Sequence, residues 1–177
     1  MIGADPTWLG WMTCAAMLIA SVLAVRAALG APAQRRFWLI IALLMVLLGL
    51  NKQLDLQTTM IEYAKSLAQA QGWYEDRAVV QRGFLIVLAG VTMIAGIVIG
   101  RMAVRGGHNT RLAGIGVLLL FLFILFRAVV IGRQDDGLPG IVRSDVVGRA
   151  LEITGVLVVC IAAWRSRSTQ PRKAGFE

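Results

Sequence analysis

Five long apolar stretches, separated by shorter polar segments, dominate the pattern of the chain. They cover approximately residues 8–29, 37–56, 79–100, 111–132 and 146–164. A helix that crosses the hydrocarbon core of a bilayer needs about 20 mostly apolar residues. The pattern therefore predicts an all-α membrane protein, a bundle of five transmembrane helices that forms a single domain over residues 1–165. Residues 166–177 are polar and basic, and we expect them to form a disordered cytoplasmic tail.

Helical periodicity continues past the end of the second apolar stretch. In residues 58–71 the apolar side chains fall at helical spacing, as at Met60, Ala64 and Leu67. This spacing is typical of an amphipathic helix. We therefore predict that the second transmembrane helix extends beyond the membrane into the periplasm.

The composition agrees with a membrane protein. The chain has 177 residues, of which 58% are hydrophobic, and its mean hydropathy is +0.72. A soluble domain of this length could not bury so much apolar surface. The surrounding solvent is therefore expected to be lipid.

The net charge of +8 is explained by the predicted topology. One side of the membrane receives ten basic residues and one acidic residue, whereas the other receives eight basic and nine acidic residues. The positive-inside rule then places the N-terminus outside and the C-terminus in the cytoplasm. Interfacial aromatic residues fit this topology, with Trp8 and Trp11 at the outer boundary and Trp38 and Trp164 at the inner one. A nucleic-acid partner is not needed to explain the charge, and no motif for one is present.

Polar and ionisable residues gather in the outer third of four predicted spans. Each unpaired charge at membrane depth costs roughly 2.5–3.5 kcal/mol on insertion scales, so these groups are expected to pair. The simplest pairs are Arg127 with Glu152 and Lys52 with Asp55. The candidate binding residues are Asn51, Lys52, Gln53, Asp55, Gln81, Arg82, Arg127, Arg149 and Glu152.

This cluster has two interpretations that the sequence leaves open. It is either a network of ion pairs that locks the bundle or a polar pocket that faces the periplasm. In a pocket, the arginines and Lys52 could hold a phosphate or carboxylate headgroup. If the protein is an enzyme, Asp55 and Glu152 are the candidate acid and base. No metal site is expected because His108, the one histidine, lies on the cytoplasmic side, and no motif indicates a cofactor.

Two segments of the chain carry a resemblance to a known group of proteins. The segment "LNKQLDLQ", followed by "AQGWYEDR", resembles a signature of small bacterial multi-pass membrane proteins of unassigned function. The resemblance covers mainly residues 50–82 and implies a location in the bacterial inner membrane. It implies no activity.

Three classes of function are compatible with these features. We favour an accessory protein that binds a membrane lipid or a membrane-protein partner through the outer polar cluster. The alternative is an intramembrane enzyme that acts on a lipid-linked or periplasmic substrate. A transporter is the weakest of the three, because the polar residues stop in the outer third and no pathway continues inward.

Overall fold

The computed structural model describes residues 8–54, 77–132 and 145–168, and these form helices joined by short turns, with no strand among them. A one-turn 3₁₀ helix, η1 (Pro32–Gln34), connects the first two α-helices. The long helices are α1 (Trp8–Gly30), α2 (Arg35–Leu54), α4 (Arg77–Arg105), α5 (His108–Gly132) and α6 (Asp145–Ser168). All five are long and apolar enough to cross a membrane, which confirms the predicted fold class.

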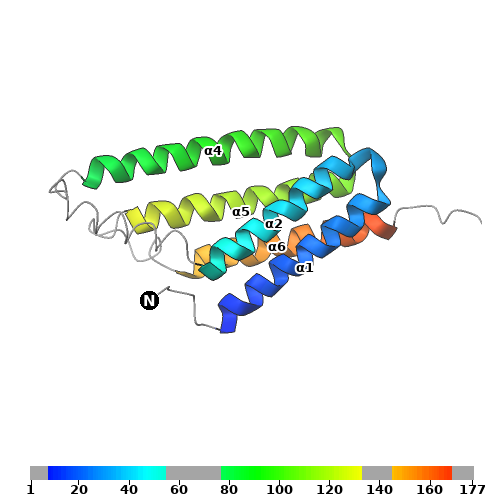
Figure 1. Ribbon diagram of the computed structural model, residues 1–177, viewed down its shortest axis with the longest axis horizontal. Helices are drawn as coiled ribbons and strands as arrows, with labels where there is room; N and C mark the ends of the chain where they lie inside the picture. The colour runs from blue at the N-terminus through cyan, green and yellow to red at the C-terminus, as the bar shows by residue number, and fades with distance from the viewer. Residues whose placement is uncertain (1–7, 55–76, 133–144, 169–177) are drawn as a thin grey trace, which may run out of the picture.

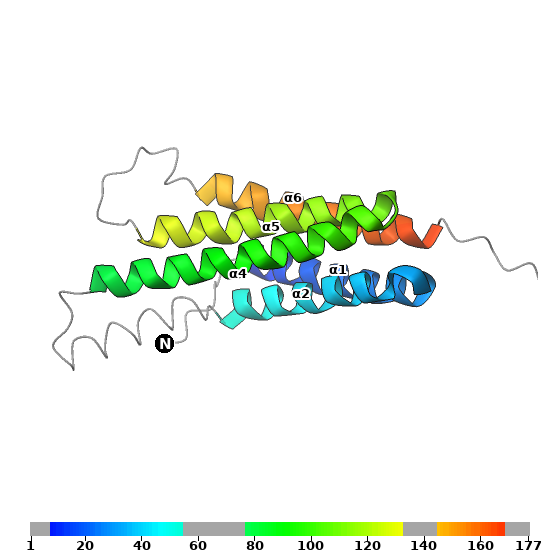
Figure 2. The same ribbon diagram turned by 90° about the horizontal axis from the view of Figure 1, so that it is seen from above.

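The helices run side by side along the long axis of the molecule (Figures 1 and 2). The α1–α2 hairpin packs on the remaining helices mainly through contacts between α1 and α6. In turn α6 packs on α5, and α5 packs on α4, which lies at the edge of the bundle. One end of the bundle contains the first residues of α1, α4 and α6 and the last residues of α2 and α5; we call it the Trp8 end.

Two tight turns make the hairpins at the opposite end. Between α1 and α2, Pro32 begins η1, where its fixed φ suits the first helical position and its missing N–H leaves no donor unpaired. Between α4 and α5, the chain turns at Gly106 and Gly107. The buried Thr110 hydroxyl lies 2.7 Å from the Gly107 carbonyl oxygen and 3.1 Å from that of Ala103, so it ties the start of α5 to the end of α4.

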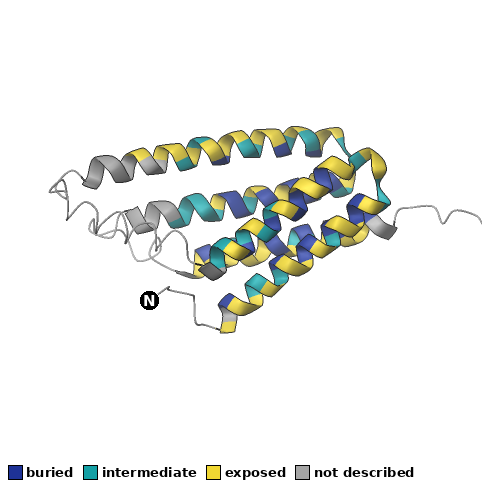
Figure 3. Ribbon diagram, in the orientation of Figure 1, coloured by how far each residue is buried: buried dark blue, intermediate teal, exposed yellow. Residues whose placement is uncertain are grey.

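The surface of the bundle is apolar, as lipid contact requires. Large side chains such as Ile86 on α4 and Leu29 on α1 are more than 70% exposed. Exposed and buried positions alternate along each helix (Figure 3). The core is small: nine of its 20 described buried hydrophobic residues are alanines, and the larger side chains include Trp38, Ile41 and Met45.

Glycines let α5 and α6 approach closely. A Cβ built on Gly155 would lie 2.9 Å from the Gly116 carbonyl oxygen, and a Cβ on Gly116 would lie 2.8 Å from the Gly155 carbonyl oxygen. The backbones therefore touch at this crossing, as small residues in membrane helices allow. By contrast, Gly100 of the GxxxG pair at 96 and 100 has no such neighbour within 4 Å, so that motif does not mark the closest packing.

Several expectations need adjustment. Trp38 is fully buried and stacks edge-on against Phe37, with ring centroids 5.3 Å apart, so its placement in an interfacial belt was wrong. Helix α6 continues to Ser168, past the expected start of the tail at residue 166, and α4 runs five residues beyond residue 100. The predicted extension of the second helix lies outside the described residues.

Candidate functional site

An ion pair between α2 and α6 is the main polar feature that the structure describes at the Trp8 end. The Lys52 ammonium lies 2.6 Å from Oε1 and 2.7 Å from Oε2 of Glu152, and donates to both oxygens. The Glu152 side chain is 3% exposed and that of Lys52 is 14% exposed. The pair is therefore almost entirely shielded from its surroundings.

The positions of the two residues explain why they meet. Lys52 occupies the last turn of α2, where the helix dipole favours a positive charge. Glu152 lies inside the membrane-spanning segment of α6, which begins at Val146, about 9 Å from that end at helical rise. A carboxylate at this depth needs a partner, and the long lysine side chain reaches it from the neighbouring hairpin. Helices α2 and α6 both pack on α1, so the ion pair connects two helices that each contact α1.

This pairing differs from the one expected from the sequence. Glu152 was assigned to Arg127, but in the structure it pairs with Lys52. The expected partner of Lys52, Asp55, lies outside the described residues. Depth and charge indicated which residues need a partner. Only the arrangement of the helices decides which of the two cations, Lys52 or Arg127, pairs with Glu152.

The remaining predicted site residues divide between described and undescribed side chains. Asn51 is half-buried beside Lys52, Arg127 is half-buried near the end of α5, and Arg149 is exposed on α6. The structure thus brings Lys52 and Glu152 into contact and leaves Arg127 and Arg149 at the same end of the bundle. The side chains of Gln53, Gln81 and Arg82 lie outside the described part, so the full polar pocket stays a prediction.

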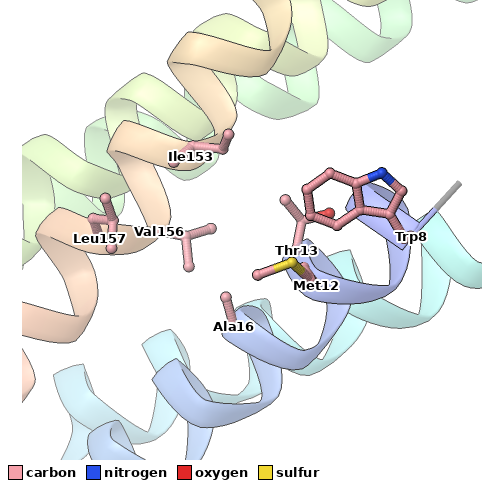
Figure 4. Close-up of a pocket in the computed structure, with 7 residues that line it drawn as sticks. All are labelled: Trp8, Met12, Thr13, Ala16, Ile153, Val156 and Leu157. Carbon is pink, nitrogen blue, oxygen red and sulfur yellow. The ribbon is translucent and has the colours of Figure 1, made fainter.

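A pocket of about 260 Å³ lies between α1 and α6 (Figure 4). Side chains from the two helices line it from opposite sides, and all but one of them are apolar. The exception, Thr13, donates its hydroxyl hydrogen to the Gly10 carbonyl oxygen at 3.0 Å within α1. The lining residues are Trp8, Met12, Thr13, Ala16, Ile153, Val156 and Leu157.

The pocket is open at its rim and closed at its base. Trp8, Met12 and Leu157 are each more than half exposed although they line it. At the base, the Cys160 thiol lies 4.0 Å from the Ala16 carbonyl oxygen, where α1 and α6 come together. No distinctive pattern in the sequence predicts this pocket, because its residues follow the same helical spacing as core residues.

The pocket and the ion pair use neighbouring faces of α6. Glu152 directly precedes Ile153 and lies one turn before Val156, both of which line the pocket. Movement of Glu152 would therefore move the pocket wall. This adjacency makes the Trp8 end a combined site with a charged side and an apolar side.

The described side chains contain no group of three or more His, Cys, Asp or Glu residues that could hold a metal ion. Cys14 and Cys160 are both free thiols, and Cys14 contacts the Gly49 carbonyl oxygen at 3.6 Å. Comparison of the chain with protein-family models, with curated proteins and with solved structures finds no match. The function must therefore be argued from the site itself.

Proposed function

We propose that the protein is a multi-pass accessory protein of the bacterial inner membrane that binds a membrane lipid at the Trp8 end. In this proposal the Trp8 end faces the periplasm, as the distribution of basic residues favours. The observation that carries the proposal is the apolar pocket between α1 and α6. The resemblance of residues 50–82 to bacterial inner-membrane proteins supports the location.

The chemistry of the pocket favours a hydrocarbon chain as its occupant. The pocket lies between two membrane-spanning segments, so its open rim faces the hydrocarbon core of the bilayer. The Thr13 hydroxyl is already hydrogen-bonded within its own helix, which leaves the Trp8 indole N–H as the one further donor of the lining side chains. A polar substrate would lose most of its hydration there for a single donor, whereas an acyl chain loses none.

The ion pair supports a binding protein over an enzyme. Lys52 donates to both oxygens of Glu152, so the carboxylate is neutralised and held in place. A general acid or base must instead exchange a proton with a substrate within hydrogen-bond reach. We therefore assign Lys52 and Glu152 to the support of the bundle, next to the pocket.

Filling the pocket tests the proposal. Ala16→Phe places an aromatic ring in the pocket, and Ala15→Phe adds the same ring at the adjacent, exposed position of α1. The full chain is purified in mild detergent, and native mass spectrometry measures the retained phospholipid. We expect wild type and Ala15→Phe to retain lipid through delipidation and Ala16→Phe to lose it.

A second variant separates loss of the pocket from loss of the fold. Ile153→Phe fills the pocket from the facing helix, and helical circular dichroism with thermal unfolding checks all variants. Lipid retention that is equal in Ala16→Phe, Ile153→Phe and Ala15→Phe would reject the proposal. So would a wild-type protein that retains no lipid.

A further inference from the structure

The two walls of the pocket belong to different parts of the bundle. The α1 wall is part of the α1–α2 hairpin, and the α6 wall is part of the group formed by α4, α5 and α6. At the base the two walls meet where the Cys160 thiol approaches the Ala16 carbonyl oxygen. At the rim the lining side chains face each other across open space (Figure 4). The width of the rim therefore depends on how the hairpin is attached to α6 above the base.

The α6 wall is fixed close to Glu152. Gly155 lies three residues after Glu152, and its backbone touches that of Gly116 on α5. This crossing of small residues holds α6 against α5 at close range. Ile153, the residue that follows Glu152, lines the pocket. The Glu152 carboxylate is thus an anchor point of known position beside the α6 wall.

The α1 wall is connected to Lys52 through α2. Gly49 lies three residues before Lys52, and its carbonyl oxygen accepts a hydrogen bond from the Cys14 thiol at 3.6 Å. A Cβ on Gly49 would lie 3.6 Å from Met17 Cβ, so α1 and α2 also pack closely here. Cys14 directly follows Thr13, which lines the pocket. A displacement of Lys52 would therefore move the α1 wall.

The ion pair completes a continuous set of contacts around the pocket. These contacts run from the α6 wall through Glu152 and Lys52 to α2, and from α2 to the α1 wall. The Lys52 ammonium donates to both carboxylate oxygens, at 2.6 Å and 2.7 Å, and such charge-assisted bonds are short and strong. Building on the proposed lipid-binding function, we infer that Lys52 and Glu152 are positioning residues that set the width of the α1–α6 pocket before the lipid binds.

A pocket of fixed width binds more tightly than one that must be ordered by its ligand. Apolar side chains cannot replace the ion pair in this role, because in a membrane they gain little from each other over lipid tails. Methionine is also flexible and fits many separations. In Lys52→Met/Glu152→Met the bundle should therefore stay folded, because no charge is left unpaired, while the width of the pocket is no longer fixed.

Lipid binding by this double variant tests the role of the pair. The delipidated full chain is titrated with dioleoylphosphatidylcholine, and native mass spectrometry gives the apparent dissociation constant. We expect the double variant to bind at least about fivefold more weakly than wild type, the lower end of typical couplings between sites. Its free energy of unfolding should stay close to that of wild type. Lys52→Arg, which keeps a cation that can donate to both oxygens, should bind much as wild type does.

Distances between spin labels test the width of the pocket directly. Trp11→Cys on α1 and Ala150→Cys on α6 are exposed sites outside the pocket lining, and Cys14→Ser with Cys160→Ser removes the native thiols. Double electron–electron resonance should give one narrow distance distribution that is the same with and without lipid. The double methionine variant should give a broader distribution. A distance that shortens when lipid is removed from the protein with an intact ion pair would overturn the inference, even if the double variant failed to fold.

A control separates positioning from general weakening of the hairpin. Ser21→Ala removes a hydrogen bond between α1 and α2 that lies outside the contacts around the pocket, and it should leave lipid binding unchanged. Three results would overturn the inference: wild-type affinity in the double methionine variant, an equal loss of affinity in Ser21→Ala, or a Lys52→Arg protein that binds as weakly as the double variant.

These outcomes also separate the positioning role from the proposed function. If Ala16→Phe abolishes lipid binding while the double methionine variant binds like wild type, the lipid-binding function stands and the positioning role is wrong. If wild type binds no lipid, the proposed function fails. The label distances then still decide whether the ion pair sets the width of the pocket.

Discussion

The ion pair between Lys52 and Glu152 allows a quantitative test of how this bundle is held together. Lys52→Met and Glu152→Met each remove one charge while keeping an unbranched side chain of similar length. The double variant removes both charges and leaves two apolar side chains facing each other. Comparing the three variants with wild type gives a double-mutant cycle, which isolates the interaction between the two residues.

The geometry indicates a large effect for each single variant. Two unit charges about 4 Å apart attract each other by about 4 kcal/mol at an effective dielectric constant of about 20. Removing one partner of a buried pair costs about 3–5 kcal/mol, because the other charge is left without compensation. The side chains are only 3% and 14% exposed, but charges can find other partners in the membrane-embedded unfolded state. We therefore expect each single variant to lose about 3 kcal/mol, near the lower limit of that range.

The double variant should behave differently from the sum of the singles. Replacing a buried ion pair by apolar residues of similar volume is often neutral or stabilising. We expect the Lys52→Met/Glu152→Met protein to lie within about 1 kcal/mol of wild type, where independent effects would give a loss of about 6 kcal/mol. The free energy of unfolding is measured by titration of a mild detergent with a denaturing one.

A matched control shows whether loss of any cation has the same effect. Arg26 is exposed on α1, and Arg26→Met should change the free energy of unfolding by no more than about 0.5 kcal/mol. If both single variants lose less than about 1 kcal/mol, the pair does not stabilise the bundle as argued. If the double variant loses as much as the two singles together, the residues do not act as a pair.

Two further predictions concern helix packing. Gly155→Ala should cost about 1–3 kcal/mol in the same unfolding assay, because its Cβ would lie 2.8 Å from Leu120 Cγ; Gly100→Ala, with nothing within 4 Å, should be neutral or stabilising. A larger loss in Gly100→Ala than in Gly155→Ala would contradict this assignment of the close contact. Ser21→Ala removes a hydroxyl that donates to the Ala42 carbonyl oxygen at 3.0 Å and should cost about 0.6 kcal/mol, the average for such bonds between membrane helices. Stability equal to wild type would show that the bond contributes nothing.

The number and type of the helices could be predicted from the sequence because they depend on a local property. Each span is a continuous apolar run. In lipid such a run forms a helix, because a helix satisfies the hydrogen bonds of its own backbone. The boundaries are less certain, as the longer α4 and α6 show, because Arg101 and Arg105 can continue a helix into the interface. The depth of the charged cluster can also be predicted from the sequence, because counting residues from the helix end and multiplying by the helical rise gives the depth of each charged residue.

The contacts between helices could not be predicted in the same way. The sequence indicates that Glu152 needs a cation, but Arg127 and Lys52 are both at suitable depths, and only the packing of α2 and α6 on α1 selects Lys52. Trp38 illustrates the same limit, because a tryptophan near a helix end is usually interfacial, whereas here the hairpin buries it completely. Its indole N–H has no hydrogen-bond partner among the described residues, a cost that no sequence pattern would anticipate.

The same packing explains why a pocket exists beside the ion pair. Helices in lipid have no hydrophobic force that closes every gap between them, so they stay together where specific contacts hold them. Helix α6 is held to α5 at the Gly116–Gly155 crossing, and it meets α1 where Cys160 approaches Ala16. Above that contact, Glu152 connects α6 to α2 through Lys52 instead of to α1. The ion pair thus fixes α6 at the level of the pocket without closing the space between α6 and α1, and that space is where the acyl chain is proposed to bind.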